Sequence, residues 1–280
     1  MKIKITVDST ADLSKELLQK NDIAVSPLYV HFDEEEKQDG ITCTPEDIYE
    51  FVEKTNNLPK TSAVSQEDYE KFFEENLKDH DALIHFNLSS KMSVTNTNAV
   101  NASKKYENVF VIDSQNLSTG TGLLALYACD LRDEGKDVKT IVEMVNEKVS
   151  KVSASFVLDK LHFLHKGGRC STISLLGANL LGIKPCIQVK DGAMGVAKKY
   201  VGKFEKVVIK YVEDQIANNP NIEPKRIFIT HTKIDSEIVA NVKTFLESLH
   251  YFDEILETTA GCTITTHCGS NTLGVLFINK

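Results

Sequence analysis

Residue types that can hold an anion are grouped in the second half of this chain. Arg169 follows the glycine pair Gly167 and Gly168, and His267 lies in a threonine-rich segment near the end of the sequence. An arginine guanidinium donates from a planar fork and stays charged, glycine lets the backbone approach a ligand closely, and a histidine ring can donate a hydrogen bond. Together these residues are suited to binding a carboxylate or a phosphate.

Serine and threonine hydroxyls are concentrated in the first half of the chain, in segments 61–65, 88–95 and 113–120. Each segment precedes an expected helix, and the last two also follow expected strands. In open α/β sheets ligands bind where strands end and helices begin, and the amides at a helix start attract anions. Capping of those helices is the alternative role, because Ser and Thr are ordinary N-cap residues.

Alternating strand and helix patterns would position these groups. We expect strands at 2–7, 23–31, 82–86 and 108–113, and helices at 9–18, from Thr44 and Pro45 onward, and at 67–77. Proline is favourable in a first helical turn. Such alternation predicts a mainly parallel sheet whose strands are joined by right-handed helical crossovers.

The pattern changes in the second half but still mixes helices and strands. Helices are expected at 138–149, 173–181, 204–218 and 236–249, and strands at 153–158, 186–189, 194–198, 226–231, 254–258 and 274–278. Asp191 and Gly192 predict a hairpin turn, because this pair supplies the positive backbone angles that such turns need. The second half is therefore expected to form another α/β lobe.

The length of the chain also favours two lobes. At 280 residues, of which 41% are hydrophobic, the chain has the size at which one core tends to divide. We expect an N-terminal α/β lobe of residues 1–151 and a C-terminal α/β lobe of residues 152–280, without a marked linker between them. The C-terminal segment is free to return to the interface between the lobes.

Composition and charge exclude several classes of partner. The net charge of -8 argues against nucleic acid and against strong attraction to anionic lipid headgroups. No apolar run approaches the roughly 18 residues needed to span a bilayer, so stable membrane insertion is not expected. The N-terminus lacks the features of a secretory signal.

Cysteine usage is typical of a reducing compartment. The 6 cysteines are scattered and form no CxxC pair, as expected for reduced thiols, so we expect a cytoplasmic protein. Cys262 and Cys268 flank the segment of His267, but their spacing matches no zinc pattern. Neither a metal nor another cofactor is expected.

Other motifs allow alternative functions. Residues 120–125 match a dinucleotide-binding pattern, but their glycines lie several residues beyond the strand end, and residues 177–184 imitate a phosphate loop imperfectly. Ser93 and His267 are a possible hydrolase pair, with Asp8 or Asp113 orienting the histidine, although no GxSxG motif is present. Elsewhere, His162 and His165 are one helical turn apart and are interpreted as packing or surface residues, or as a contact near a phosphate.

Segments in the same order resemble those of the DegV family. Residues 8–13 are similar to its Asp-Ser-x-x-Asp-Leu start, residues 61–65 to its Thr-Ser-Gln-Pro-Ser, and residues 89–93 to its Ser-Ser-x-Leu-Ser. The resemblance extends through further segments: Asp113 and Ser114 with Gly120 and Gly122, 167–169, 183–185 and 267–269. It therefore covers almost the whole chain.

The resemblance implies a lipid-binding function. Characterised members of the family bind fatty acids and present them to a kinase. Carried over to this sequence, the contacts to the fatty-acid carboxylate are Thr61, Ser62, Ser93 and His267, with Arg169 nearby. The resemblance implies a cytoplasmic protein that binds a long-chain fatty acid, catalyses no reaction itself and presents the acid to the catalytic subunit of a fatty acid kinase for acyl phosphate formation.

The acyl chain in this family enters an apolar tunnel between the lobes. Its lining is expected from Phe163, Leu164, Ile173, Leu175, Leu176, Leu180 and Leu181. Each buried methylene would contribute roughly 0.8 kcal/mol. Ordinary core packing is the alternative role of these residues, because their helical spacing is equally typical of a core.

This sequence departs from the family pattern around the head-group loops. Ala63 and Val64 replace Gln and Pro, Val94 replaces a Gly, and Ser270 lies where a glycine and proline phrase is usual. Loss of the glycine at position 94 removes a place of close backbone approach. A serine-dependent acyl hydrolase and a binding module for another small acid are therefore kept as alternatives.

Overall fold

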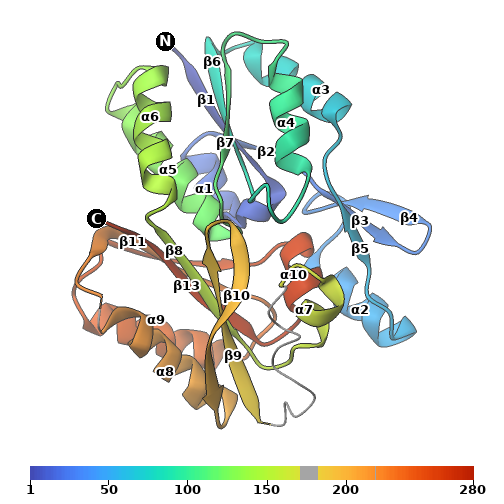
Figure 1. Ribbon diagram of the computed structural model, residues 1–280, viewed down its shortest axis with the longest axis vertical. Coiled ribbons are helices and arrows are strands. Elements are labelled where there is room, and N and C mark those ends of the chain that lie inside the picture. The colour runs from blue at the N-terminus through green and yellow to red at the C-terminus, as the bar shows by residue number, and fades with distance from the viewer. Residues whose placement is uncertain (171–181, 218) are drawn as a thin grey trace.

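The computed structural model describes residues 1–170, 182–217 and 219–280, arranged as two lobes stacked along the long axis (Figure 1). The upper lobe is built on a parallel sheet of strand order β2-β1-β6-β7. Its strands are β1 (Ile3–Asp8), β2 (Ile23–Ser26), β6 (Ala82–Asn87) and β7 (Val109–Asp113). The mainly parallel N-terminal sheet predicted from the sequence is confirmed.

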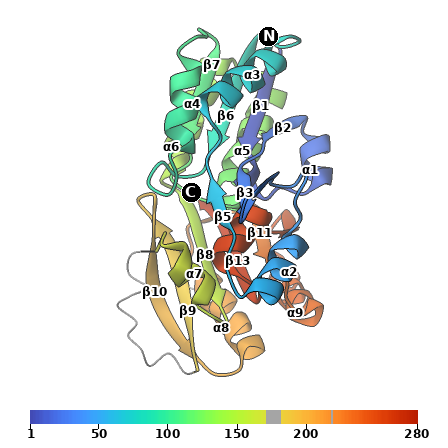
Figure 2. The same ribbon diagram turned by 90° about the vertical axis from the view of Figure 1, so that its right-hand side faces the viewer.

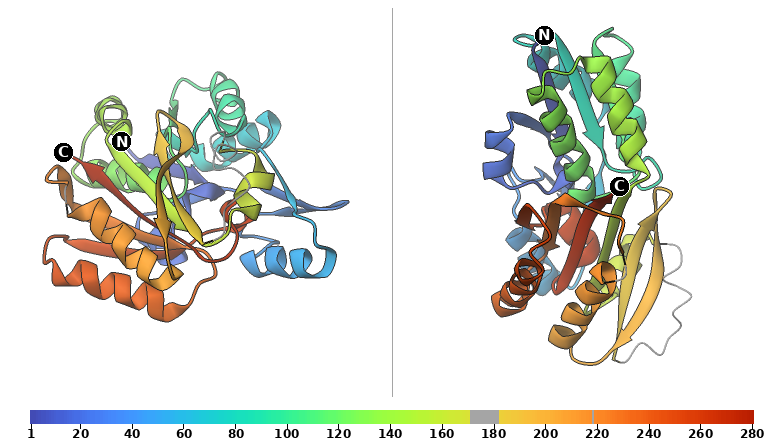
Figure 3. Two further views of the ribbon diagram at one scale, coloured as in Figure 1. Left: turned by 60° about the horizontal axis from the view of Figure 1, so that its bottom comes forward. Right: turned by 90° about the vertical axis from the view of Figure 1, so that its left-hand side faces the viewer.

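Helices cover both faces of this sheet. α3 (Gln66–Leu77) and α4 (Thr95–Ser103) pack together on one face, and α5 (Thr119–Asp133) and α6 (Val138–Val149) on the other (Figure 3). Because both faces are covered, all 6 residues of β1 and all 6 of β6 are buried. Because the strands are parallel, their C-terminal ends all lie at the lower edge of the sheet, which faces the second lobe (Figure 1).

The lower lobe contains a mixed sheet of order β10-β9-β8-β13-β11-β12, in which only β11 and β12 pair in parallel among the described strands. Its strands are β8 (Val152–Leu158), β9 (Ile183–Lys190), β10 (Ala193–Val201), β11 (Ile222–His231), β12 (Glu254–Thr259) and β13 (Thr272–Asn279). α8 (Phe204–Ile216) and α9 (Ser236–Ser248) lie side by side on its outer face (Figure 3). The predicted hairpin is confirmed, with positive φ at Asp191 and Gly192.

Smaller elements lie beside the junction of the lobes. A short antiparallel sheet of β3 (Tyr29–Phe32), β4 (Glu35–Gln38) and β5 (Lys60–Ser62) projects with α2 (Pro45–Thr55) from the right-hand side in Figure 1, the side that faces the viewer in Figure 2. α7 (His162–Gly167) and α10 (Cys262–Cys268) pack against each other. α10 also contacts α2, β3 and β5, so a helix from the end of the chain lies against elements from its first quarter.

The largest hydrophobic core extends across both lobes, and a second core lies between the lower sheet and the helices α8 and α9. α5 contacts strands of both large sheets, and the largest cluster of buried apolar residues includes Ile5 and Leu83 from the upper sheet and Phe156 and Leu276 from the lower one. We propose to keep the division at residues 1–151 and 152–280, because the upper sheet ends before this point and the lower sheet begins at Val152. The shared core explains why no linker is visible in the sequence.

Several local predictions differ from the structure. The helix expected at 9–18 is a short 3-10 turn, η1 (Ser9–Ala11), followed by α1 (Lys15–Lys20), because Asp12 adopts a left-handed conformation between them. The strand expected at 23–31 is divided at Pro27 into β2 and β3, which belong to different sheets. The helix expected at 173–181 lies outside the described residues. Every helix in the described ranges is too short or too polar to span a bilayer.

Candidate ligand-binding site

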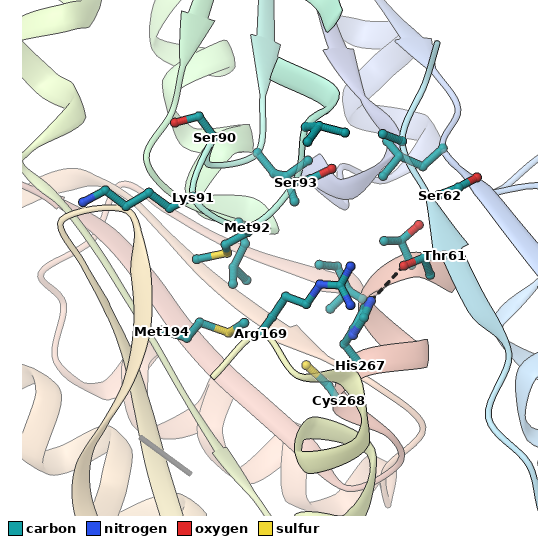
Figure 4. Close-up of a pocket in the computed structure, with 17 residues that line it drawn as sticks. Thr61, Ser62, Ser90, Lys91, Met92, Ser93, Arg169, Met194, His267 and Cys268 are labelled. Atoms are coloured by element: carbon teal, nitrogen blue, oxygen red, sulfur yellow. Dashed lines mark hydrogen bonds between the residues drawn. The ribbon is translucent and has the colours of Figure 1, made fainter. Parts of the chain in front are cut away.

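A cavity of about 460 Å³ lies between the lobes and contains all five predicted head-group residues in its lining. Thr61 and Ser62 come from β5, Ser93 from the loop between β6 and α4, His267 from α10 and Arg169 from the segment after α7. Figure 4 shows them arranged around one space. The fold thus brings together side chains that are far apart in the sequence.

The position of His267 depends on how α10 begins. The N-cap residue Gly261 has no side chain to cap the helix. Instead, Asp39 accepts hydrogen bonds from the amides of Cys262 (2.7 Å) and Thr263 (2.9 Å), and Asp12 accepts one from Gly261 (2.8 Å). Carboxylates at a helix start satisfy its free amides and complement its dipole. The N-terminal lobe therefore supplies the cap of the helix that positions His267.

Both aspartates of this cap are buried in the protein interior. Burial raises the pKa of Asp12 well above its usual value, against the opposing effect of the Ser118 hydroxyl, which donates to its carboxylate. Asp12 and Asp39 also border a separate cavity of about 210 Å³, and the hydrogen bonds that they accept come from protein groups. We assign them a structural role in holding α10.

His267 forms a direct contact with Thr61. Its Nε2 atom lies 2.9 Å from Thr61 Oγ1, while its buried Nδ1 atom has no hydrogen-bond partner among the described residues. A Cβ added to Gly167 would lie only 2.4 Å from Nδ1, so a hydrogen on Nδ1 would point at the Gly167 backbone. We therefore assign the proton to Nε2, which donates to Thr61 and leaves the Thr61 hydroxyl free to donate into the cavity.

The environment keeps the His267 imidazole neutral. Burial, with a smaller contribution from the positive charge of Arg169, lowers the pKa of His267 from 6.5 to about 4. The Arg169 guanidinium lies beside the imidazole in Figure 4 and is exposed to solvent at the edge of the cavity. One of its nitrogens donates to the Gly167 carbonyl oxygen (2.8 Å). Arg169 is thus the permanent cation of this group and His267 a neutral donor.

The two serines among the predicted head-group residues differ in whether their hydroxyls are free to bind a ligand. Ser62 follows Thr61 on β5, so its side chain points to the other side of the strand, and its hydroxyl lies 2.8 Å from His31 Nε2. Figure 4 shows this hydroxyl directed away from His267. Ser93 Oγ accepts from the Thr95 amide (3.2 Å), and its own proton remains available to a ligand. Ser93 is therefore a more direct candidate than Ser62 for a hydrogen bond to the ligand.

The rest of the cavity is largely apolar. Its lining includes Leu28, Leu88, Met92, Leu117, Met194 and Ile264. Leu117, Ile264 and Cys268 also border a second small cavity of about 30 Å³, which continues toward the lower sheet. A polar group of donors and an apolar chamber therefore share one space.

The predicted tunnel lining is wrong for its two described members. Leu164 is buried in the shared core and Phe163 packs against Gly269, so neither borders the cavity. The other expected lining residues, Ile173, Leu175, Leu176, Leu180 and Leu181, lie outside the described residues. The observed apolar lining instead comes from separate strand ends, loops and the short helix α10, which share no periodicity, and this is why the sequence pattern did not identify it.

The tip of the β9–β10 hairpin closes one side of the cavity. The Ser89 hydroxyl donates to the Gly192 carbonyl oxygen (2.7 Å), and Lys91 Nζ donates to the Asp191 carbonyl oxygen (2.7 Å). Met194, on the same hairpin, lines the cavity. The hairpin of the lower lobe is therefore attached to the loop after β6 of the upper lobe.

The geometry does not support the hydrolase alternative. His267 pairs with Thr61 rather than Ser93, and no described carboxylate contacts its Nδ1. The two proposed orienting groups are used elsewhere: Asp8 bonds Thr10, Asn87 and Leu88, and Asp113 accepts from the amides of Ser90 and Gln115. The proposed triad of Ser93, His267 and Asp8 or Asp113 is therefore not formed.

The glycines of the dinucleotide-like motif have a structural role. Gly120 and Gly122 lie inside α5, where an added Cβ would clash with Asn116 and Leu13, so they permit close packing rather than phosphate contact. His162 and His165 are exposed on α7. Most of segment 177–184, which resembles a phosphate-binding loop, lies outside the described residues. Among those residues, no group of three or more His, Cys, Asp or Glu side chains is arranged to hold a metal ion.

The fold and the cavity are those of a two-lobed α/β protein in which polar donors and an apolar chamber share one space. The model of the DegV family matches residues 2–280, and the chain belongs to this family. A DegV domain-containing protein of Clostridium acetobutylicum is 33% identical, with 100% of this chain and 99% of the relative covered. A protein of Thermotoga maritima named as a fatty acid-binding protein is 31% identical, with 98% and 96% covered.

A solved structure supports the same assignment. The structure of a DegV family protein from Thermus thermophilus, described by its fatty acid binding, matches with a TM-score of 0.91 and 27% identity over 100% of both chains. The two-lobed α/β fold expected from the sequence is confirmed by this likeness.

Proposed function

We propose that this protein binds a long-chain fatty acid in the cavity between its lobes, as a binding protein without catalysis of its own. The observation that supports this proposal is the combination of a hydroxyl, imidazole and guanidinium cluster with an apolar chamber in a single cavity of about 460 Å³. The family relatives named for fatty acid binding support the choice of ligand.

The head group would lie between the two lobes. An ionised carboxylate cannot be buried without partners, whereas hydrogen bonds from several donors make burial tolerable. Thr61, freed to donate by the contact with His267, and Ser93 would bind its oxygens, while Arg169 balances its charge at the edge of the cavity. Ser62 would support Thr61 from the far side of β5.

The hydrocarbon chain would contribute most of the affinity. Each methylene removed from water against Leu28, Leu117 or Ile264 would stabilise the complex by roughly 0.8 kcal/mol. Part of this gain offsets the cost of ordering the chain. A chamber that mixes leucine, isoleucine and methionine can adapt to the ligand because methionine side chains are flexible.

We further propose that the bound acid is presented in the cytoplasm to a separate fatty acid kinase, which forms the acyl phosphate. The exposed Arg169 at the edge of the cavity supports this idea, because a fixed guanidinium beside the carboxylate suits an incoming phosphate. The resemblance of the sequence to presenting subunits supports it as well. Binding and presentation can be measured separately.

Binding is tested on protein stripped of lipid by hydrophobic resin. Native mass spectrometry and calorimetry should show one long-chain fatty acid per chain, with Thr61→Val and Ser93→Ala weakening it and the exposed-site variant Lys190→Ala serving as a control. A folded protein that takes up no fatty acid would contradict the proposal.

Presentation is tested by adding a fatty acid kinase catalytic subunit with labelled ATP and measuring acyl phosphate.

A further inference from the structure

Thr263 is a residue of the cavity lining that neither the motifs nor the family resemblance singled out. It lies in the first turn of α10, four residues before His267. Residues four apart share one face of a helix, so both side chains approach the cavity from the same side. Thr263 is 4% exposed, and its hydroxyl has no hydrogen-bond partner within the described ranges.

Two other threonines of α10 show which kind of hydrogen bond Thr263 lacks. Thr266 donates to the Cys262 carbonyl oxygen (2.8 Å), and Thr265 donates to that of Ala260 (3.3 Å). Thr263 is too close to the helix start to have a carbonyl of a preceding helical turn below it. Buried hydroxyls in folded proteins normally have a partner, because leaving one unpaired is costly. The missing partner is therefore expected to come from a ligand.

We propose that the Thr263 hydroxyl donates a hydrogen bond to the carboxylate of the bound fatty acid. This inference rests on the proposed function and adds a residue to it. A carboxylate offers two oxygens with about four acceptor positions, more than Thr61 and Ser93 can fill. A donor at Thr263 would favour an ionised acid over its ester, which cannot present two equivalent charged oxygens.

The test compares the wild type with Thr263→Val, Thr263→Ser and Thr266→Val, all stripped of lipid. Valine has nearly the shape of threonine but lacks the hydroxyl, and serine keeps it. Calorimetry with oleic acid and with methyl oleate measures both affinities. We expect Thr263→Val to bind the acid roughly 10-fold more weakly and the ester as the wild type does. Thr263→Ser and Thr266→Val should stay within about 2-fold of the wild type for the acid.

Melting of the ligand-free proteins gives a second readout. Thr263→Val should melt at the same temperature as the wild type or higher, because it removes an unpaired buried hydroxyl. Unchanged acid affinity in Thr263→Val, an equal loss for acid and ester, or a ligand-free melting temperature several degrees lower would each overturn the inference. If the folded wild type bound no fatty acid, the proposed function itself would fail, and this outcome is distinct from all three.

Discussion

The His267 Nε2 atom lies 2.9 Å from the Thr61 hydroxyl oxygen, across a separation of 206 residues in the sequence. This contact joins α10 of the C-terminal half to β5 of the N-terminal half at the polar end of the cavity. Because Nε2 donates to Thr61, the Thr61 proton can be directed toward a ligand.

Replacement of Thr61 by valine should weaken fatty-acid binding by about 1.5–3 kcal/mol, the usual effect of losing a hydrogen bond to a charged group. Thr61→Ser keeps the hydroxyl and should bind nearly as the wild type does. Calorimetry on lipid-free protein measures both. Equal affinities for all three proteins would show that Thr61 does not contact the head group.

Gly167→Ala should displace the imidazole of His267. The added Cβ would lie 2.4 Å from Nδ1, closer than real contacts allow, although the backbone at Gly167 accepts an alanine. We expect about a 10-fold loss of affinity with a stable fold, measured by calorimetry and thermal melting. Lys166→Ala, an exposed change on the same helix, is the matched control and should bind normally.

The His267 pKa should make part of the stability dependent on pH. A folded-state pKa of about 4, below the ordinary 6.5, means that the unfolded chain binds the extra proton between these values. Stability should therefore rise between about pH 4 and 6.5 and be lost on acidification, by up to about 3 kcal/mol. Urea unfolding at pH 4.5 and 7 should show a smaller difference in His267→Gln than in the wild type, with the exposed His165→Gln as the control.

Arg169→Ala should separate binding from presentation. The guanidinium is exposed at the edge of the cavity, so fatty-acid affinity should change only a few-fold, while acyl phosphate formation by an added kinase should fall at least 10-fold. Arg169→Lys should recover little, because an ammonium lacks the planar fork. Loss of binding with unchanged phosphorylation per bound lipid would reverse this division of roles.

Weakening the hairpin contact should speed ligand release. Ser89→Ala removes the hydrogen bond to the Gly192 carbonyl, and the hairpin that contains Met194 forms one wall of the cavity. Stopped-flow displacement of a fluorescent fatty acid should show a several-fold faster dissociation rate, since changes at one site act mostly on dissociation. Lys190→Ala, on the same hairpin with an exposed side chain, should leave the rate unchanged.

The sequence predicted most regular elements because their patterns are local. Buried apolar runs marked β1, β6 and β7, and the pair Asp191 and Gly192 marked the hairpin. α10 was missed because threonine and cysteine give it no helical signal, and its stability comes from carboxylates at Asp12 and Asp39 that are remote in the sequence. A helix cap supplied by residues that are distant in the sequence gives no local pattern from which it could be predicted.

The candidate site was predictable only through the resemblance to a family. Thr61, Ser93, His267 and Arg169 line one cavity, but no spacing rule relates positions on β5, on α10 and in two separate loops. The apolar lining could not be identified in the same way, because Leu28, Leu117 and Ile264 come from separate segments. Thr263 had one signal: it precedes His267 by four residues on a helix that was itself not recognised.

Asp12 and Asp39, which begin α10, have a consequence for how this protein can be made. Expressed alone, residues 152–280 would contain a helix whose first amides have lost their acceptors, and residues 1–151 would contain buried carboxylates that have lost their donors. Neither fragment contains all the residues that line the cavity. Under the proposed function, a chain interrupted before α10 would hold no lipid, and loading would begin only after α10 has packed against the N-terminal lobe.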